Sequence, residues 1–154
     1  MAANAVIDSL RDAELTFELL PHRRTETAVG EANALGVLPQ ETAKTLIVRA
    51  DDTFVRAVLP ASERLDLHKL RDVLGARDVE LVSEADLGRE YPEFELGAVP
   101  PFGGAHADNV VVDRRLCTCD FVVLEAGTHE ESLRLRMTDL LELTNAQLGD
   151  IARD

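Results

Sequence analysis

The stretch that decides the fold is KTLIVRADDTFVRAVLP, residues 44–60. Two runs rich in β-branched residues, 44–49 and 53–59, are separated by Ala50-Asp51-Asp52, which suits a hairpin connection. Pro60 has no N–H group to donate, so the second strand is expected to stop there. The pattern therefore predicts a β-hairpin.

Helical and strand patterns alternate on either side of this hairpin. Before it we expect a helix at 2–12, a strand at 15–20, and a helix that Thr25 or Thr27 caps and Gly36 ends. After it we expect a leucine-rich helix from residue 61 to Gly75, a strand at 79–82 and a short helix capped by Ser83.

The C-terminal third predicts more of the sheet. Residues 109–113 and 120–125 are nearly continuous apolar runs, typical of strands covered on both faces, and are expected in the middle of the sheet. In 132–137, leucines and a methionine alternate with Arg134 and Arg136, so the apolar side chains should face the core. Thr138 is expected to cap a last helix that reaches Leu148. The fold class is α/β, with a mixed, strongly curved sheet of about seven strands and four or five helices.

Length and charge limit the function. The 154 residues suffice for one domain with a single core, here residues 1–154. No apolar run approaches the roughly 18 residues of a membrane span, and no secretory leader is visible, so we expect a cytoplasmic protein without membrane contact. The net charge of −13, from 16 basic and 29 acidic residues, argues against DNA and against any long nucleic-acid interface.

Common catalytic motifs are missing from the sequence. It contains no G-x-S-x-G, G-x-x-x-x-G-K-[ST], H-E-x-x-H or G-x-G-x-x-G pattern. Cys117 and Cys119 are one residue apart, unlike the usual redox and zinc pairs, and are expected to be ordinary thiols. We therefore expect no metal and no cofactor.

The segment Gly97-Ala98-Val99-Pro100-Pro101-Phe102-Gly103 restricts its own backbone. Two prolines fix φ, whereas the glycines at both ends permit positive φ and let another group approach the main chain. Such a segment suits a pocket wall that holds a ligand through backbone N–H groups. The alternative is a structural proline-containing loop.

Three polar side chains are further candidates. Lys44 stands where an apolar strand begins, at a boundary where pockets form, although a lysine there can also extend to solvent from the sheet rim. His106 follows the loop and His129 lies in a strand connection, so each could approach a pocket; solvated or structural roles are the alternative.

Taken together, these motifs resemble the YbaK/EbsC family. The resemblance rests on Ala43-Lys44-Thr45-Leu46, the 97–103 segment, Val110-Val111-Val112-Asp113 and Glu125-Ala126-Gly127-Thr128, and covers roughly residues 16–145. This family contains aminoacyl-tRNA deacylases related to the editing domain of bacterial prolyl-tRNA synthetases. It implies a barrel-like mixed sheet surrounded by helices.

The resemblance also implies a reaction and a site. Water would attack the ester of a mischarged tRNA carrying a small amino acid, without a covalent nucleophile or a metal. Lys44 would hold a phosphate or the ester carbonyl, and N–H groups around Gly97 and Gly103 would orient that carbonyl. The remaining substrate-binding candidates are Thr45, Val99, Pro100, Pro101, Phe102, His106 and His129.

The expected partners are the acceptor end of an aminoacyl-tRNA and, for delivery, an aminoacyl-tRNA synthetase. Basic residues that could meet the tRNA are His22-Arg23-Arg24, Arg114-Arg115, Arg134 and Arg136. Two alternatives stay open. One is a non-catalytic ligand-binding or regulatory module, and the other is a small-molecule ester or thioester hydrolase.

Overall fold

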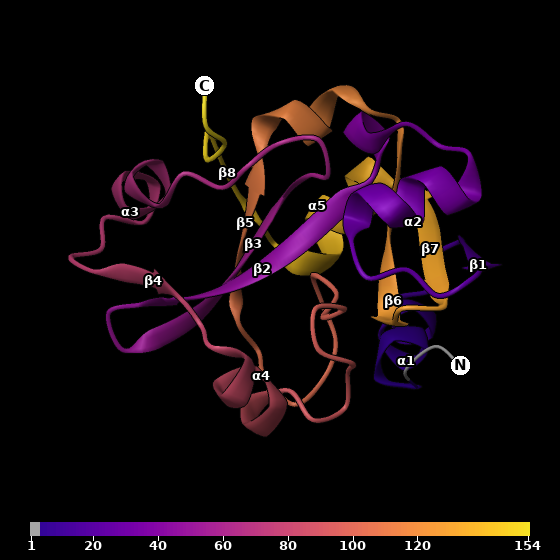
Figure 1. Cartoon of the computed structure of the whole chain (residues 1–154), viewed down its shortest axis with the longest axis horizontal. Helices are drawn as coiled ribbons and strands as arrows, with labels where there is room; N and C mark the ends of the chain where they lie inside the picture. Colours follow the sequence, from indigo (N-terminus) through magenta and orange to yellow (C-terminus); the bar gives the residue numbers. More distant parts are fainter. Residues whose placement is uncertain (1–3) are drawn as a thin grey trace.

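The computed structural model describes residues 4–154, which form one α/β unit with two sheets (Figure 1). The helices are α1 (Asn4–Asp12), α2 (Ala28–Leu35), α3 (Leu67–Leu74), α4 (Glu84–Glu90) and α5 (Met137–Thr144), with short 3-10 helices η1 (Pro39–Glu41) and η2 (Arg114–Thr118). The strands are β1 (Phe17–Pro21), β2 (Ala43–Ala50), β3 (Thr53–Pro60), β4 (Val79–Leu81), β5 (Asn109–Asp113), β6 (Phe121–Thr128), β7 (Glu131–Arg136) and β8 (Gln147–Gly149).

The larger sheet has five strands in the order β4-β2-β3-β5-β8. The predicted hairpin is confirmed, because β2 and β3 pair antiparallel with Lys44 opposite Leu59 and Ala50 opposite Thr53. Strand β5 lies between β3 and β8 and is parallel to both, as its continuous apolar run predicts. The sheet is therefore mixed.

The smaller sheet has three antiparallel strands in the order β1-β7-β6. The expectation that β6 lies in the middle of a sheet was wrong, because β6 is an edge strand. Its residues Val122, Val123 and Leu124 are nevertheless buried, and a bridge between Val123 and Thr42 joins β6 to the residue before β2. Within residues 4–154 the strands do not close into a barrel, so the barrel-like part of the expectation is not confirmed.

Capping residues recognisable in the sequence predicted most of the helix ends. Thr27 caps α2 by accepting from Gly30 N–H, and Gly36 ends it in the left-handed conformation at φ 70°. Helix α3 begins later than expected, because Asp66 accepts from two N–H groups of its first turn. Thr138 does not cap α5, which begins at Met137, directly after β7. The expected extension of this helix to Leu148 was also wrong, since Leu148 belongs to β8.

Two groups of buried side chains hold the sheets together. One group joins α1, both sheets and α5, and includes Val6, Leu124, Leu133 and Leu140. The other packs α3 against the larger sheet and includes Leu59, Leu70 and Ile151. Leu133, Leu135 and Met137 are buried as their alternation predicts. In residues 4–154 no helix has the length and apolar character needed to cross a membrane.

Candidate active site

A cavity of about 340 Å³ lies where the two sheets meet. Its lining comes from the start of α2, the start of β2, the residue after β3, the 97–103 segment and β6: Glu26, Thr27, Ala28, Val29, Ala43, Lys44, Thr45, Leu46, Ala61, Gly97, Val99 and Glu125. The size is at the lower end of the roughly 300–1,000 Å³ typical of ligand pockets. Such a cavity suits a small group rather than a large ligand.

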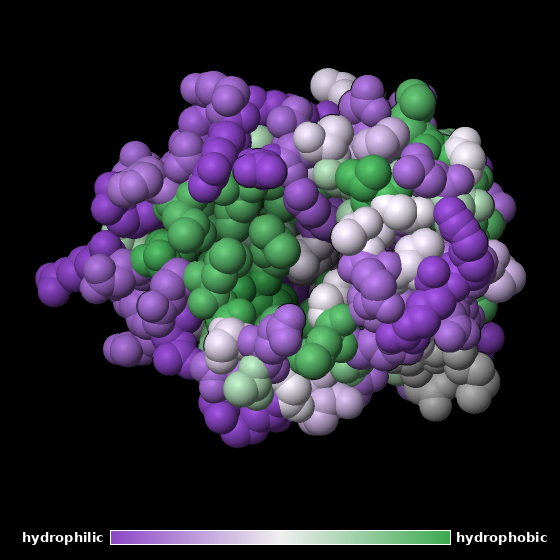
Figure 2. All heavy atoms as spheres, in the orientation of Figure 1, coloured by the Kyte–Doolittle hydropathy of each residue, from purple (hydrophilic) through white to green (hydrophobic). Residues whose placement is uncertain are grey.

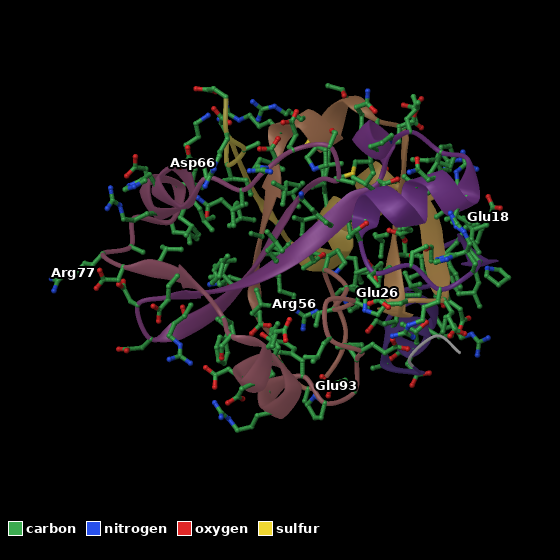
Figure 3. The ribbon with its side chains drawn as sticks, in the orientation of Figure 1. Glu18, Glu26, Arg56, Asp66, Arg77 and Glu93 are labelled. Carbon is green, nitrogen blue, oxygen red and sulfur yellow. The ribbon has the colours of Figure 1, made fainter. Side chains whose placement is uncertain are left out.

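The cavity adjoins an apolar face of the larger sheet. Figure 2 shows this face as the broad hydrophobic area between α3 and β2. Leu46 lines the cavity and packs against the buried group under α3, so it belongs to both. On the other side, Glu26 lies near the start of α2 (Figure 3). The cavity is thus bounded by an apolar wall and a polar wall.

Lys44 is the one cation among the cavity-lining residues that the structure describes. Its side chain is half-buried, and no hydrogen bond or ion pair of its ammonium is formed with residues 4–154. Burial lowers the pKa of Lys44, and the nearby Arg64 lowers it further, whereas Glu63 acts in the opposite direction. The ammonium is therefore available to an anionic or carbonyl ligand.

Gly97 forms the wall on the loop side. Its φ of 80° lies in the left-handed region, where glycine is favoured over residues with a side chain. Among the described residues its N–H donates no hydrogen bond, while the next residue, Ala98, donates to Glu95 O at 3.0 Å. Gly97 thus lines the cavity and has a backbone N–H group without a partner among the described residues.

His129 forms a hydrogen bond with the loop that contains Gly97. It is 3% exposed, and its Nε2 lies 2.6 Å from the carbonyl oxygen of Leu96, the residue before Gly97. Since a carbonyl only accepts, Nε2 must carry the hydrogen. A Cβ added at Gly97 would lie 3.6 Å from the imidazole Cε1. His129 does not line the cavity; it fixes the segment that does.

A bend in β6 brings Glu125 to His129. In a straight strand, residues four apart are about 13 Å from each other. Here the register with β7 shifts between Glu125 and Thr128, and Gly127 has φ 93°, as at a β-bulge. Glu125 Oε2 consequently lies 3.3 Å from His129 Nδ1.

Two buried carboxyl groups in this region hold their protons tightly. Burial raises the pKa of Glu125 to about 9, and the charges of Glu31, Glu95 and Glu26 add to the effect. Burial raises the pKa of Glu31 to about 7, although its hydrogen bond with Ser132 opposes the shift. At neutral pH Glu125 is therefore mainly the neutral acid.

These carboxyl groups predict how stability depends on pH. Both groups bind a proton in the folded protein up to about pH 7 and 9, whereas in the unfolded chain they lose it near 4.5. The folded state therefore holds more protons, so the free energy of unfolding should fall as pH rises, by at most about 1.4 kcal/mol per unit for each group. Urea unfolding between pH 5 and 9 measures the slope.

Glu125→Gln should make this slope less steep above pH 7, since the amide does not titrate. Glu80→Gln, an exposed position on β4, is the matched control and should keep the slope of the unchanged protein. Identical slopes in the Glu125 variant and the unchanged protein would contradict the assignment of a buried neutral carboxyl group.

The structure brings only part of the predicted site together. Lys44, Thr45, Gly97 and Val99 line the cavity, whereas Pro100, Pro101, Phe102, Gly103, His106 and His129 do not. Phe102 is 7% exposed and packs in the core with α1. Gly103 faces α1 too, because a Cβ added there would lie 3.2 Å from Ala5 O. The expectation that Gly103 meets a substrate in this cavity is not confirmed.

The second half of the loop is held by Arg56 instead. Figure 3 labels Arg56 on β3 beside the loop between α4 and β5. Its guanidinium donates to Pro100 O and Gly103 O, both at 2.8 Å, and to Asp108 Oδ2 at 3.0 Å. His106 belongs to this cluster, since its carbonyl oxygen accepts from Arg56 at 3.3 Å and its ring stacks on Tyr91, whose hydroxyl donates to Asp108 at 2.6 Å.

Comparison with known proteins agrees with this geometry. The sequence pattern of the family "Aminoacyl-tRNA editing domain" matches residues 22–143, which include every residue that lines the cavity. The chain belongs to this family. The resemblance to YbaK/EbsC proteins is thereby confirmed.

Individual members of the editing family extend the comparison. The chain is 29% identical over 115 residues to a proline–tRNA ligase of Thermoanaerobacter sp. strain X514, covering 71% of this chain but 20% of the ligase. The chain thus spans about a fifth of the ligase that it matches. It is 27% identical over 126 residues to EbsC of Enterococcus faecalis, named as a candidate Cys-tRNA(Pro)/Cys-tRNA(Cys) deacylase, with 81% of this chain and 76% of that protein covered.

A solved structure of the editing family has the same fold over nearly its full length. The crystal structure of a candidate trans-editing enzyme for prolyl-tRNA synthetase superimposes with a TM-score of 0.86 at 25% identity, covering 99% of this chain and 97% of that one.

Sequence reasoning missed two residues of this editing domain. Glu125 was noted only as part of a family motif, yet it lines the cavity. Arg56 falls within a predicted strand without any predicted role, yet it is 1% exposed. A signal was available for Arg56, because Phe54 and Val58, which share its face of the strand, are apolar, and an arginine between them on a buried face needs a partner. No local signal marked Glu125, since the bend of β6 that places it depends on pairing with β7.

Proposed function

We propose that this chain is a trans-editing aminoacyl-tRNA deacylase that hydrolyses the ester of a mischarged tRNA carrying a small amino acid. The observation that carries the proposal is that Lys44 and Gly97 line one small cavity. A cation and an unpaired backbone N–H group at the same cavity can bind an ester and stabilise the oxyanion formed when water attacks it. We place this activity in the cytoplasm.

Each residue of the cavity has a role in this scheme. Lys44 holds the terminal phosphate or the ester carbonyl, and Gly97 N–H orients that carbonyl. The neighbouring hydroxyl of the ribose helps to position the water. Val99 and Leu46 limit the volume for the amino-acid side chain, which excludes large ones sterically, although an apolar pocket discriminates a single methylene by only about 1–3 kcal/mol.

The charge of the protein favours contact with only the acceptor end of the tRNA. Three of the seven candidate basic residues already form ion pairs within residues 4–154: Arg24 pairs with Glu95 at 3.1 Å, Arg115 with Asp150 at 3.1 Å and Arg134 with Glu18 at 3.2 Å. A net charge of −13 would repel a long phosphate backbone. A synthetase that delivers the acceptor end would overcome this repulsion.

Hydrolysis of labelled Ala-tRNA, Ser-tRNA and Cys-tRNA tests the proposal, including forms mischarged onto the proline tRNA, beside free amino-acid esters. We expect turnover of at least one of these tRNAs well above the rate without protein. No turnover of any substrate would favour the non-catalytic ligand-binding module. Turnover of the free esters alone would favour the small-molecule ester hydrolase.

A further inference from the structure

The cavity holds a carboxyl group for which the proposed function has no role. We propose that Glu125 binds the α-ammonium group of the aminoacyl ester, and so makes the enzyme select aminoacyl groups over acyl groups without a positive charge. This inference rests on the proposed deacylase function. It adds a binding subsite for a cation to the cavity.

The geometry of Glu125 points to a missing partner. Its side chain is 11% exposed, and Glu125 is among the residues that line the cavity. Oε2 is fully buried and lies 3.3 Å from His129 Nδ1, so it is the oxygen that can share the carboxyl proton with the imidazole, whereas Oε1 forms no hydrogen bond with the described residues. Oε1 is not among the fully buried oxygens, so a ligand in the cavity can donate to it and give this half-buried carboxyl group the partner that it lacks.

The surrounding charges select the kind of donor. The carboxyl groups whose charges act on Glu125 are Glu31, Glu95 and Glu26, and Glu26 also lines the cavity. Arg24 pairs with Glu26 and Glu95, yet the charges of these acids still act on Glu125, so the position beside Glu125 favours a small cation. An α-amino group has a pKa of about 7.7–8.0, so much of it is the ammonium at neutral pH. An aminoacyl ester brings this cation into the cavity together with its carbonyl.

His129 can take the proton that Glu125 gives up. An ammonium beside Glu125 favours the ionised carboxylate, so the proton leaves Oε2. Since His129 Nε2 donates to Leu96 O at 2.6 Å, Nδ1 has a lone pair and faces Oε2 at 3.3 Å. One O–H bond breaks and one N–H bond forms, without another reactant. The imidazolium continues to donate to Leu96, so the subsite is connected to the residue before Gly97.

A pair of substrates that differ in one group tests this inference. Ala-tRNA and lactyl-tRNA, its deaminated form, carry the same methyl group on the same tRNA, but lactate has a hydroxyl group where alanine has the ammonium. We expect the unchanged protein to prefer Ala-tRNA by about tenfold or more in kcat/KM, as for a hydrogen bond between charged groups. Glu125→Gln should bring this preference close to one by slowing only the alanyl reaction.

Glu95→Gln is the matched control, because Glu95 acts on the charge of Glu125 but is not among the residues that line the cavity. It should keep the preference. Equal rates on both substrates in the unchanged protein would overturn the inference, and so would an equal loss on both substrates in Glu125→Gln. A loss confined to Ser-tRNA would assign Glu125 to a side-chain hydroxyl instead, which also overturns it.

The two proposals fail in different ways. If the unchanged protein hydrolyses no aminoacyl-tRNA, the deacylase function fails and the subsite fails with it. If it hydrolyses Ala-tRNA without regard to the ammonium, only the subsite fails. Equal rates of the unchanged protein on Ala-tRNA and lactyl-tRNA would overturn the subsite even if Glu125→Gln does not fold, and a circular-dichroism melt of the variant checks its folding.

Discussion

Replacing Lys44 with methionine should lower kcat/KM for deacylation by a factor on the order of 10²–10³, the loss seen when one group that stabilises an oxyanion is removed. Methionine keeps the length of the side chain and removes the charge. Lys44 is the one cation among the described residues that line the cavity, so no other side chain there replaces it. Single-turnover deacylation of the best substrate measures the effect.

The fold should tolerate this change. Burial and Arg64 lower the pKa of Lys44, which means that folding disfavours its charged form. A neutral side chain of similar size removes this cost, so the circular-dichroism melt should stay nearly unchanged. Lys69→Met is the matched control, since Lys69 pairs with Asp150 and Asp154 at the C-terminus, and it should keep full activity. Full activity of Lys44→Met would remove Lys44 from the mechanism.

Features set by neighbouring residues were predictable from the sequence. The β2–β3 hairpin and the glycine ends of α2 and α3 follow from local turn and cap chemistry, and the structure has them. The wrong placement of β6 has a different cause. A continuous apolar run shows that both faces of a strand are buried, but not whether both of its edges pair with other strands of the same sheet. One edge of β6 pairs with β7, and the other edge forms only a bridge from Val123 to Thr42.

In the candidate site, too, some residues were predictable from the local sequence and others depend on distant contacts. Lys44 and Gly97 were recognisable because each is unusual in its local sequence and matches a family motif, and they do lie at one cavity. The second half of the loop looked equally suitable, with its prolines and glycine. Its position depends on Arg56, which is more than forty residues away along the chain, and pairing at that separation cannot be read from local sequence.

Arg56 should be the most important polar side chain for stability in this part of the protein. Its side chain is 2% exposed, and Asp108, its partner, is 6% exposed. Removing one member of a buried ion pair leaves the other charge without compensation, which typically costs about 3–5 kcal/mol. Arg56→Met should therefore lower the free energy of unfolding by about this amount, as measured in urea.

Arg71→Met is the control for this change, because Arg71 is 42% exposed and lies 3.8 Å from Asp72. An exposed pair of this kind should change stability by no more than about 0.5 kcal/mol. Adding Asp108→Asn to Arg56→Met should restore part of the loss, since it removes the unpaired carboxylate. A cost below about 1 kcal/mol for Arg56→Met would show that Arg56 does not hold the loop.

A loss of activity should accompany the loss of stability. The carbonyls of Pro100 and Gly103 accept from Arg56, and Val99, just before them, lines the cavity. Arg56→Lys keeps the charge, but its single ammonium cannot match the fixed fork of donors that reaches both carbonyls and Asp108. Deacylation by folded Arg56→Lys should therefore be slower, whereas folded Arg71→Lys should be unaffected. Because Arg56 does not line the cavity, a slower Arg56→Lys would show that the position of the loop, and not only its sequence, is required for the reaction.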